Sequence, residues 1–362
     1  MNIVITGGAG FLGARLARAL LKQGSFSVNG QAPQAIRQLT LVDQFQPPAD
    51  LLADARVRAC VGDLNAVLTP GPQGVPALPE GTDVVYHLAA AVSAECEADF
   101  DLGLRSNLAP TQALLAACRA LGTQPVVVFA SSLAVFGLPA EAPNPTGPWV
   151  VSDLTLPTPQ TSYGIQKFIG EQLMADYSRK GYIRGRSARL MTVSVRPGKP
   201  NGAASGFFSG MVREPLSGLK GACPVSRDVE VALSSPNRTV EGLIRVGQAT
   251  DAEWGPRTAI NMPALVTTVG EMAAALERVA GPGAAALIDW TPDEHIRRIV
   301  RSWPGRVESP RARALGLQAD PDFDTVIRDY AHENPHVVRS EEHTSELQSH
   351  LNLVCRLLLE KK

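Results

Sequence analysis

Asn2-Ile3-Val4-Ile5-Thr6-Gly7-Gly8-Ala9-Gly10-Phe11-Leu12-Gly13, at the start of this 362-residue chain, is the stretch that decides the fold. An apolar run of strand length ends in glycines at three-residue spacing, Gly7, Gly10 and Gly13, and apolar side chains then repeat at helical spacing up to Gln23. The stretch therefore predicts a strand, a glycine turn and a helix.

This order of elements is typical of a dinucleotide-binding unit. Glycine has no Cβ, so the turn can be tight and its backbone can approach a pyrophosphate, while N–H groups at the start of the helix point at phosphate oxygens. Phe11 and Leu12, between the last two glycines, belong to the same predicted contact surface. Alone the pattern is weak, because any strand-to-helix turn can hold several glycines.

The composition excludes several classes of protein. Hydrophobic residues make up 44% and the formal net charge is −1, which excludes a disordered chain and a basic nucleic-acid-binding protein. No apolar run reaches the roughly 18 residues of a membrane span, and the N-terminus lacks a secretory signal, so we expect a cytosolic protein. The five cysteines include no CxxC pair and no histidine at metal spacing, so neither disulfides nor a metal site is predicted.

Further apolar runs of strand length alternate with helical stretches, which predicts a parallel sheet covered on both faces. The runs are 39–42, 57–61, 84–87, 126–130 and 187–195, and two of the helices are Leu104–Leu121 and Tyr163–Lys180. After residue 197 the pattern loosens, although Thr268 and Thr291 start stretches with the spacing of a helical capping box. We therefore predict a doubly wound α/β domain over residues 1–196 and a smaller substrate lobe over residues 197–338.

The C-terminal stretch Arg339–Lys362 differs in composition from the Ala-, Arg- and Pro-rich text before it. Its first half, Arg339–His350, resembles the conceptual translation of a common short-read sequencing adapter. We therefore interpret this tail as an assembly artefact and assign no function to it. The alternative is an amphipathic helix, because several leucines after Leu347 fall at helical spacing.

Asp43 ends the second predicted strand, where a carboxylate can accept both ribose hydroxyls and repel a 2′-phosphate. The two residues after it offer no compensating cation, so the sequence favours NAD over NADP. Asp43 lies farther from the glycines than the roughly 20 positions that are usual, and a loop insertion over Gly24–Gln38 explains the difference. The alternative is a turn aspartate. Asp63, followed by Leu64, is a candidate for the adenine side of the cofactor or a solvated loop acid.

A second group of residues can carry out acid–base chemistry. Tyr163 and Lys167 are four residues apart and share one helix face, and Ser132 ends the strand before that helix. An ammonium beside a phenol favours the phenolate, which predicts a lowered pKa for Tyr163. Tyr163 can then accept a hydroxyl proton while Ser132 hydrogen-bonds the same oxygen. His87, at the end of another buried strand, is interpreted as structural.

With these residues the chain resembles the extended short-chain dehydrogenase/reductase family, which includes nucleotide-sugar epimerases and dehydratases. The resemblance covers Met1 to about His336. It rests on the glycine turn, His87-Leu88-Ala89-Ala90, Asn107, the segment 131–137, and Tyr163-Gly164-Ile165-Gln166-Lys167.

The resemblance implies roles for these residues. Ser132, Tyr163 and Lys167 would be the catalytic trio, Lys167 would also hold the nicotinamide ribose, and Asn107 would support a proton relay. The backbone of Ala89, Ala90 and Ala91 and of Pro197–Gly198 would line the cofactor. It also implies a homodimer that pairs through Leu104–Leu121 and Tyr163–Lys180.

Two departures narrow the position within the family. Leu133-Ala134 stands where the dehydratases have Asp-Glu, which disfavours sugar dehydration. Val195-Arg196-Pro197-Gly198-Lys199-Pro200-Asn201 replaces the Arg-Tyr-Phe-Asn-like turn of the nucleotide-sugar epimerases. Together with the segments 162–164, 175–180 and 203–216, this is similar to the members that oxidise the four-carbon sugar acid D-erythronate at C2 with NAD.

Three arginines are candidates for binding a substrate carboxylate, because a guanidinium presents a matching fork of donors. They are Arg196, Arg213 and Arg238, of which we single out Arg213. Ser93 and Asn201 are candidates for contacts to substrate hydroxyls. Two other functions stay open, namely a nucleotide-sugar 4-epimerase that holds NAD tightly and a non-catalytic NAD-binding regulator.

Overall fold

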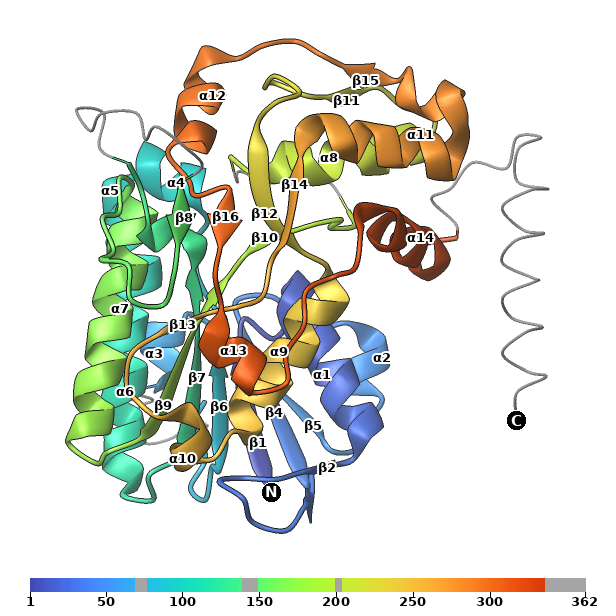
Figure 1. Ribbon diagram of the computed structural model, residues 1–362. Coiled ribbons are helices and arrows are strands. Elements are labelled where there is room, and N and C mark those ends of the chain that lie inside the picture. Colours follow the sequence, from blue (N-terminus) through green and yellow to red (C-terminus); the bar gives the residue numbers. More distant parts are fainter. Residues whose placement is uncertain (69–76, 139–148, 199–203, 336–362) are drawn as a thin grey trace.

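A computed structural model describes residues 1–68, 77–138, 149–198 and 204–335, and a seven-stranded sheet forms the base of the molecule (Figure 1). Across the sheet the strands are β13 (Ile260–Asn261), β9 (Arg184–Leu190), β7 (Val126–Ser132), β6 (Val84–His87), β1 (Asn2–Thr6), β4 (Gln38–Asp43) and β5 (Val57–Val61). Every neighbouring pair is parallel. The chain order reverses between β1 and β6, so the predicted doubly wound α/β fold is confirmed.

Helices cover both faces of this sheet (Figure 1). One face carries α1 (Phe11–Gln23) and α9 (Pro236–Gln248), and the other carries α3 (Leu64–Leu68), α6 (Ala109–Leu121) and α7 (Ser162–Arg179). Ile3 and Ile5 of β1 pack in the core on the α1 side, whereas Val4 packs in the core on the α6 side. Because both faces are covered, the central strands are continuous apolar runs, which is why the sequence located them well.

A second core lies above the carboxyl ends of the sheet strands and belongs to the smaller lobe (Figure 1). Its three-stranded sheet consists of β10 (Thr192–Val193), β12 (Glu230–Ser234) and β14 (Leu265–Thr268), and its longer helices are α8 (Gly206–Leu216), α11 (Val269–Ala285) and α14 (Phe323–Glu333). Phe208, Met272 and Ile327 are among the buried side chains that join these helices to the small sheet.

Part of the predicted substrate lobe returns to the large sheet. Helix α9 packs beside α1 and adds Leu243 and Val246 to the core there, and β13 pairs with β9. Helix α13 (Pro310–Ala314) adds Ala312 to the same core. The division into residues 1–196 and 197–338 stays a prediction, and the packing adds that the chain passes between the two cores repeatedly.

One predicted helix start is wrong. The sequence indicated a cap at Thr291, but α12 spans Glu294–Arg301 and is capped by Asp293. The carboxylate of Asp293 accepts two backbone N–H groups of the first turn, whereas the Thr291 hydroxyl donates to Asp289. A carboxylate that accepts two donors and faces the helix dipole is the stronger cap. The start predicted at Thr268 is confirmed, since its hydroxyl accepts the N–H of Glu271.

The remaining elements are short. They are β2 (Ser25–Phe26), β3 (Gln34–Ala35), α2 (Ala49–Leu52), α4 (Ser93–Ala98), α5 (Phe100–Gly103), the π-turn η1 (Leu104–Leu108), the 3-10 turn η2 (Leu133–Val135), β8 (Val150–Val151), β11 (Gly221–Ala222), α10 (Asp251–Trp254), β15 (Ile288–Asp289) and β16 (Arg306–Val307). The insertion predicted as a loop over Gly24–Gln38 contains a small antiparallel pair, β2 with β3. Phe26 of β2 is fully buried.

Some predictions fall outside the described residues, namely those on Asn201 and on the tail Arg339–Lys362. In the described part of the chain, no helix has both the length and the apolar character needed to cross a bilayer. Cys60, Cys96, Cys118 and Cys223 are free thiols in buried positions.

Candidate active site

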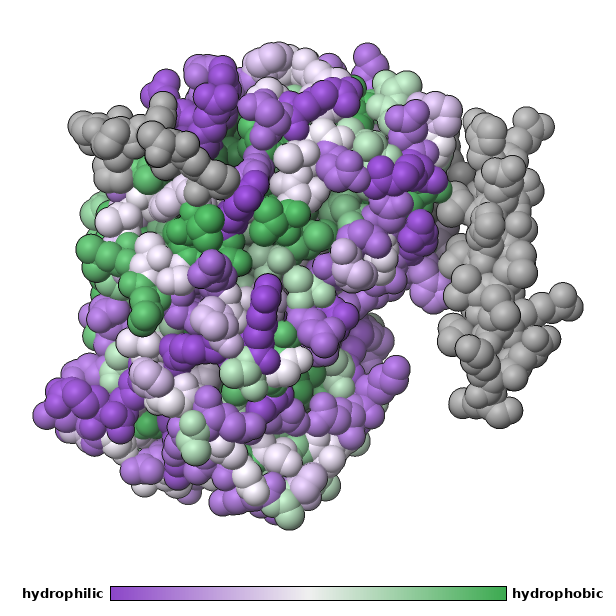
Figure 2. All heavy atoms as spheres, viewed as in Figure 1, coloured by the Kyte–Doolittle hydropathy of each residue, from purple (hydrophilic) through white to green (hydrophobic). Residues whose placement is uncertain are grey.

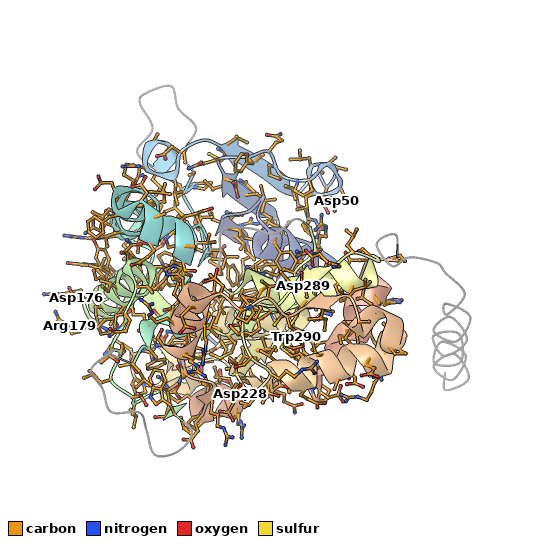
Figure 3. The ribbon with its side chains drawn as sticks, turned by 90° about the horizontal axis from the view of Figure 1, so that it is seen from above. Asp50, Asp176, Arg179, Asp228, Asp289 and Trp290 are labelled. Atoms are coloured by element: carbon orange, nitrogen blue, oxygen red, sulfur yellow. The ribbon has the colours of Figure 1, made fainter. Side chains whose placement is uncertain are left out.

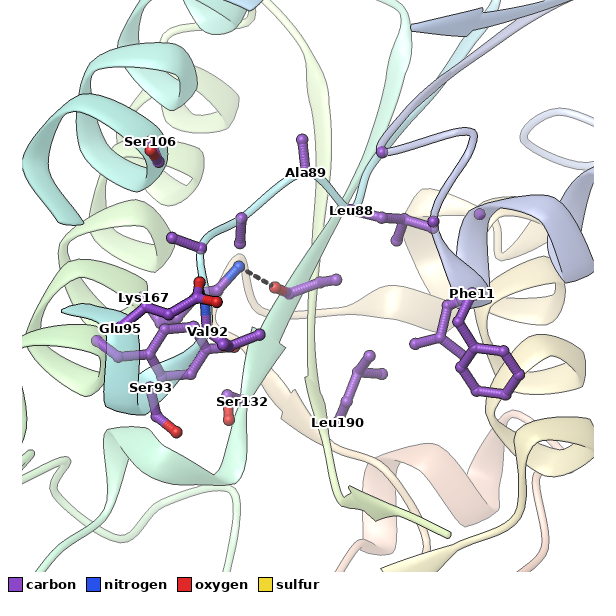
Figure 4. A pocket seen from close by; sticks show the side chains of 18 of the residues that line it. Phe11, Leu88, Ala89, Val92, Ser93, Glu95, Ser106, Ser132, Lys167 and Leu190 are labelled. Carbon is purple, nitrogen blue, oxygen red and sulfur yellow. Dashed lines mark hydrogen bonds between the residues drawn. The ribbon is translucent and has the colours of Figure 1, made fainter. Parts of the chain in front are cut away.

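A cavity of about 700 Å³ lies at the carboxyl ends of the strands of the large sheet, where the smaller lobe meets them. Ligands of doubly wound sheets bind at this edge, close to the point where the strand order reverses. Figure 4 shows Phe11 on one wall and Ser93, Ser132 and Lys167 on the opposite wall. The residues predicted from sequence that line the cavity are Gly7, Gly10, Phe11, Leu12, Gly13, Asp43, Asp63, Leu64, Ala89, Ala90, Ser93, Ser132, Tyr163, Lys167 and Arg196.

The glycine turn between β1 and α1 forms one end of this cavity. Gly7 has a φ of +73°, and a Cβ added there would lie 2.9 Å from the backbone nitrogen of Ala89. A Cβ on Gly13 would lie 2.0 Å from the carbonyl oxygen of Gly7, so α1 can start this close to the turn only with glycine at that position. The bare backbone and the helix N-terminus that result fit a pyrophosphate.

Two carboxylates lie beside the turn. Asp43, at the end of β4, accepts the backbone N–H of Ala9 at 3.0 Å and that of Phe45 at 3.1 Å. Asp63 directly precedes α3, and its carboxylate accepts the N–H of Asn65 at 3.0 Å. Both acids line the cavity, and their contacts to the cofactor stay predictions.

The other end of the cavity holds the predicted catalytic trio. Ser132 ends β7, its hydroxyl accepts the N–H of Ala134 at 3.1 Å, and it lines the cavity together with Tyr163. Lys167 lies one turn after Tyr163 on α7, with Nζ 5.6 Å from the centre of the tyrosine ring and donating to the carbonyl oxygen of Ala130 at 2.9 Å (Figure 4). The three side chains thus converge on one wall.

Helix α7 reaches this wall because two local features fix its start. The hydroxyl of Thr161 caps the helix by accepting the N–H of Gly164 at 3.1 Å. A Cβ on Gly164 would lie 2.1 Å from the carbonyl oxygen of Ala134, so glycine permits the close approach of α7 to the end of β7. Ser132 and Tyr163 are brought together by this approach.

A model of the NAD dependent epimerase/dehydratase family matches residues 3–231. The chain belongs to this family. The resemblance to extended short-chain dehydrogenases/reductases is thereby confirmed.

The chain can be aligned with relatives over nearly the whole length of each relative. A D-erythronate dehydrogenase of Cupriavidus necator is 48% identical over 332 residues, which cover 91% of this chain and 98% of the relative. A D-erythronate dehydrogenase of Haemophilus influenzae is 40% identical over 331 residues, with coverages of 91% and 98%. A crystal structure described as a nucleoside-diphosphate-sugar epimerase from Agrobacterium tumefaciens has a TM-score of 0.80 at 41% identity and covers 93% of this chain and 95% of that one.

Burial has a larger effect than any neighbouring charge on the pKa values of Tyr163 and Lys167. Burial raises the pKa of Tyr163 to about 12, although the hydrogen bond with Ser132 and the charge of Arg196 both act to lower it. Burial also lowers the pKa of Lys167 to about 8. The predicted lowering of the tyrosine pKa by Lys167 is therefore wrong for this structure, in which the ammonium is directed at Ala130.

Asn107 does not line the cavity and holds its wall from behind. Its side chain accepts the N–H of Ala91 at 2.8 Å and donates to Gln166 at 2.8 Å and to Cys96 at 3.2 Å. These bonds fix the backbone after β6 against α7, which makes Asn107 a positioning residue for Ala91. A part in a proton relay stays a prediction.

His87 is structural, as its sequence context indicated. Its Nδ1 lies 2.7 Å from the Thr6 hydroxyl and its Nε2 lies 2.9 Å from the Thr111 hydroxyl, which itself donates to the carbonyl oxygen of Asn107. Burial lowers the pKa of His87 to about 3, so the ring is neutral and links β1, β6 and α6.

The three arginines that the sequence offers for binding a substrate carboxylate lie in different surroundings. Arg196 lines the cavity, whereas Arg213 does not, since its guanidinium binds the carboxylate of Glu214 and the carbonyl oxygen of Arg196. The preference for Arg213 is therefore corrected: this side chain is already paired behind the wall. Arg238 pairs with Glu241 on the surface, and Pro197 is not among the lining residues.

Several lining residues were missed by sequence analysis. Ser205 and Trp303 come from the smaller lobe, and Phe45, Glu95 and Arg105 come from loops and short helices around the sheet edge. They carry no motif, and they reach the cavity through tertiary packing of segments far apart in sequence. Phe45 alone had a local signal, because it follows Asp43 by two positions.

We expect the protein to bind NADH more tightly than NADPH, because the Asp43 carboxylate repels a 2′-phosphate. Asp43→Asn should reduce this preference at least about tenfold, equivalent to roughly 1.4 kcal/mol. Fluorescence titration with both reduced cofactors measures the ratio without a substrate, and Asp63→Asn is the matched control. Equal affinities of the unaltered protein for NADH and NADPH would show that Asp43 does not contact the ribose.

The lowered pKa of Lys167 predicts a pH-dependent stability. Between about pH 8 and the ordinary lysine value of 10.5, the unfolded chain binds a proton at this site that the folded protein does not, so the free energy of unfolding rises with pH. Relative to Lys167→Met, the unaltered protein should gain at most about 1.4 kcal/mol per pH unit across this window.

Thermal midpoints of the two proteins measured from pH 7 to pH 10 check this expectation. Lys180→Met, at the exposed end of the same helix, is the control and should change the midpoint equally at every pH. A constant difference between the unaltered protein and Lys167→Met would contradict it.

Proposed function

We propose that this protein oxidises D-erythronate at its C2 hydroxyl to 2-dehydro-D-erythronate with NAD. The observation that carries the proposal is the agreement with two D-erythronate dehydrogenases along nearly their entire length. It is supported by the cavity, which places a serine, a tyrosine and a lysine around one point at the end opposite the glycine turn.

The residues divide the chemistry between them. NAD, when bound, supplies the acceptor for the hydride that leaves C2. Ser132 orients the C2 hydroxyl by hydrogen bonding, and Tyr163 accepts its proton as the carbonyl bond forms. The tyrosine must lose its own proton first, and the positive charge of Arg196 and the hydrogen bond with Ser132 both favour that form.

The cofactor would be held by groups spaced along the cavity. The backbone of the glycine turn fits its pyrophosphate, Asp43 fits the adenosine ribose, and the segment Ala89–Ala91 lines the path between the two ends. Lys167 is placed to bind the nicotinamide ribose once its ammonium turns from the carbonyl oxygen of Ala130.

A second candidate function is nucleotide-sugar 4-epimerisation. It is favoured by the likeness to the structure described as a nucleoside-diphosphate-sugar epimerase, at 41% identity. A non-catalytic NAD-binding regulator is the third, and the convergence of Ser132, Tyr163 and Lys167 in one cavity speaks against it. Of the three functions, the dehydrogenase alone consumes free NAD, and conversion of a substrate then separates the epimerase from the regulator.

We expect the purified protein to reduce added NAD with D-erythronate, more slowly with other four-carbon sugar acids, and not with UDP-glucose or UDP-galactose. Absorbance of the reduced cofactor measures turnover. Tyr163→Phe keeps the ring but removes the proton acceptor, so turnover should fall by a factor on the order of 100 or more while NADH affinity changes little.

Conversion of UDP-sugars alone, with no net NAD reduction, would instead establish the epimerase. Near-normal turnover in Tyr163→Phe would remove the assigned role of the tyrosine. Binding of NADH without turnover of any substrate in the panel would favour the regulator.

We also propose that the protein is a homodimer that pairs through α6 and α7. The exposed residues on the first turns of α7 are uncharged, Ile165, Ile169 and Gln172, and those on α6 include Ala109, Gln112 and Ala116. Figure 2 shows apolar residues gathered on the side of the molecule where Figure 1 places α5, α7 and β8. Phe100, the first residue of α5, is exposed, and so are Leu154 and Leu156 between β8 and α7.

The uncharged strip ends at Asp176 and Arg179, which pair with each other at 2.6 Å and lie at the edge of the molecule in Figure 3. A second copy of the same surface would bury the isoleucines, which gives the strip a reason to lack charges.

Replacing both isoleucines by glutamate, as Ile165→Glu with Ile169→Glu, should convert the dimer to a monomer, because burying four carboxylates in a symmetric interface is strongly unfavourable. Light scattering after gel filtration measures the mass. Leu219→Glu, at an exposed apolar position of the smaller lobe, should leave the dimer intact. A monomeric unaltered protein at micromolar concentration would exclude this interface.

A further inference from the structure

We propose that the guanidinium of Arg196 binds the carboxylate of the substrate, and that Arg213 positions Arg196 from behind without contacting the substrate. This inference rests on the sugar-acid oxidation proposed above and adds to it the residue that selects an acid over a neutral polyol.

The position of Arg196 is fixed through its backbone while its side chain stays available. Its N–H donates to the hydroxyl of Ser209 at 3.0 Å, and its carbonyl oxygen accepts from Arg213 at 2.8 Å, so the main chain is held from two sides by α8. The side chain lines the cavity, is half-buried, and has no hydrogen bond or ion pair with any residue in the described parts of the chain. A desolvated, unpaired guanidinium in a cavity is a ready site for an anion.

The other cations on the cavity wall are already engaged. Lys167 donates to the carbonyl oxygen of Ala130, and Arg105, on the rim, lies 3.7 Å from Asp99 with about two thirds of its side chain exposed to solvent. Arg196 is therefore the lining cation that has no partner among the described residues.

The acids that line the cavity leave this charge uncompensated. Asp43 and Asp63 accept backbone N–H groups at the glycine-turn end, and Glu95 is turned back onto the N–H of Val92. Arg196 lines the same cavity as Tyr163, and its charge acts to lower the pKa of that tyrosine.

Arg213 supports Arg196 and does not compete with it. It is almost fully buried on α8, and its charge is balanced by Glu214, whose carboxylate accepts it at 2.5 Å. A neutralised pair behind the wall holds the backbone of Arg196 without adding a second attractive charge to the cavity. One arginine thus binds and the other positions.

The surroundings of Arg196 suit the remainder of a sugar acid. Ser205, at the start of α8, and Ser93, at the start of α4, line the same cavity as Ser132 and carry hydroxyls for the hydroxyls of the substrate. Trp303 from the smaller lobe adds an apolar wall.

The test compares D-erythronate with its neutral counterpart erythritol. Arg196→Gln should raise KM for D-erythronate on the order of 10- to 100-fold, the loss expected for a charged hydrogen bond, and leave KM for erythritol nearly unchanged. Because the charge that favours deprotonated Tyr163 is also lost, kcat should fall by the same factor with both substrates. Arg196→Lys should recover part of the loss, because an ammonium keeps the charge but not the fork. Arg238→Gln, whose arginine pairs with Glu241 on the surface, is the matched control and should behave as the unaltered protein.

A binding measurement separates recognition from catalysis. Calorimetric titration measures the affinity of Tyr163→Phe, saturated with NAD, for D-erythronate. Adding Arg196→Gln to this variant should weaken that affinity by the same factor by which Arg196→Gln raises KM. Arg213→Ala should shift the acid-to-erythritol ratio in the same direction by a smaller factor, and Arg213→Lys should restore it, because a lysine can still donate to the carbonyl oxygen of Arg196.

The outcomes distinguish this inference from the proposed function. If D-erythronate is oxidised but Arg196→Gln keeps the preference for the acid, or if Arg213→Ala loses more of it than Arg196→Gln, the inference is overturned and the proposed function stands. If the substrate is a different sugar acid, and Arg196→Gln abolishes the preference of the enzyme for that acid over its neutral counterpart, the inference stands and the substrate is revised. If the protein oxidises erythritol as readily as D-erythronate, the inference is overturned, and if it oxidises no acid in the panel, the proposed function is overturned.

Discussion

The buried ion pair between Glu171 and Arg189 holds together the elements that carry the active site. Two hydrogen bonds of 2.8 and 2.9 Å join the side chains, which are both buried, and the Glu171 carboxylate also accepts the hydroxyl of Ser131 at 2.5 Å. The contacts therefore tie α7 to the ends of β7 and β9. Glu171 follows Lys167 by one turn and Tyr163 by two on the same helix face, so the ion pair between Glu171 and Arg189 sets where this face of α7 meets Ser132. Removing one partner would leave a buried charge unpaired, at a cost of about 3–5 kcal/mol.

Acidic and basic side chains lie at opposite ends of the cavity. The carboxylates of Asp43 and Asp63 lie at the glycine-turn end, and the cations Lys167 and Arg196 lie at the other. A dinucleotide placed along the cavity would have carboxylates beside the ribose hydroxyls of its adenosine end. Its other end would lie beside positive charge, which favours loss of a proton from a substrate hydroxyl. The same positive charge suits an anionic substrate, so cofactor orientation and substrate class depend on one electrostatic pattern.

The sequence predicted the fold well because its signals are local. The glycine turn needs residues without a Cβ, and strands covered on both faces must be continuous apolar runs, so both features are visible in a single chain. That Ser132, Tyr163 and Lys167 line one cavity could also be predicted, because Tyr163 and Lys167 lie one helix turn apart and Ser132 ends a strand.

What the sequence could not predict depends on tertiary packing. Ser205 and Trp303 reach the cavity from the smaller lobe, and the choice between Arg196 and Arg213 depends on which guanidinium Glu214 neutralises. The direction of the Tyr163 pKa was mispredicted for the same reason, since the degree of burial is a property of the folded protein and not of residue spacing.

The repeated passage of the chain between its two cores has a consequence for how the protein unfolds. Connections run from β9 to β10, from β12 to α9 and from β13 to β14, so strands of the large sheet and of the small sheet alternate along the sequence. Neither core can lose its structure without pulling on several segments of the other. The two lobes should therefore melt in one cooperative transition, unlike two domains joined by a single linker.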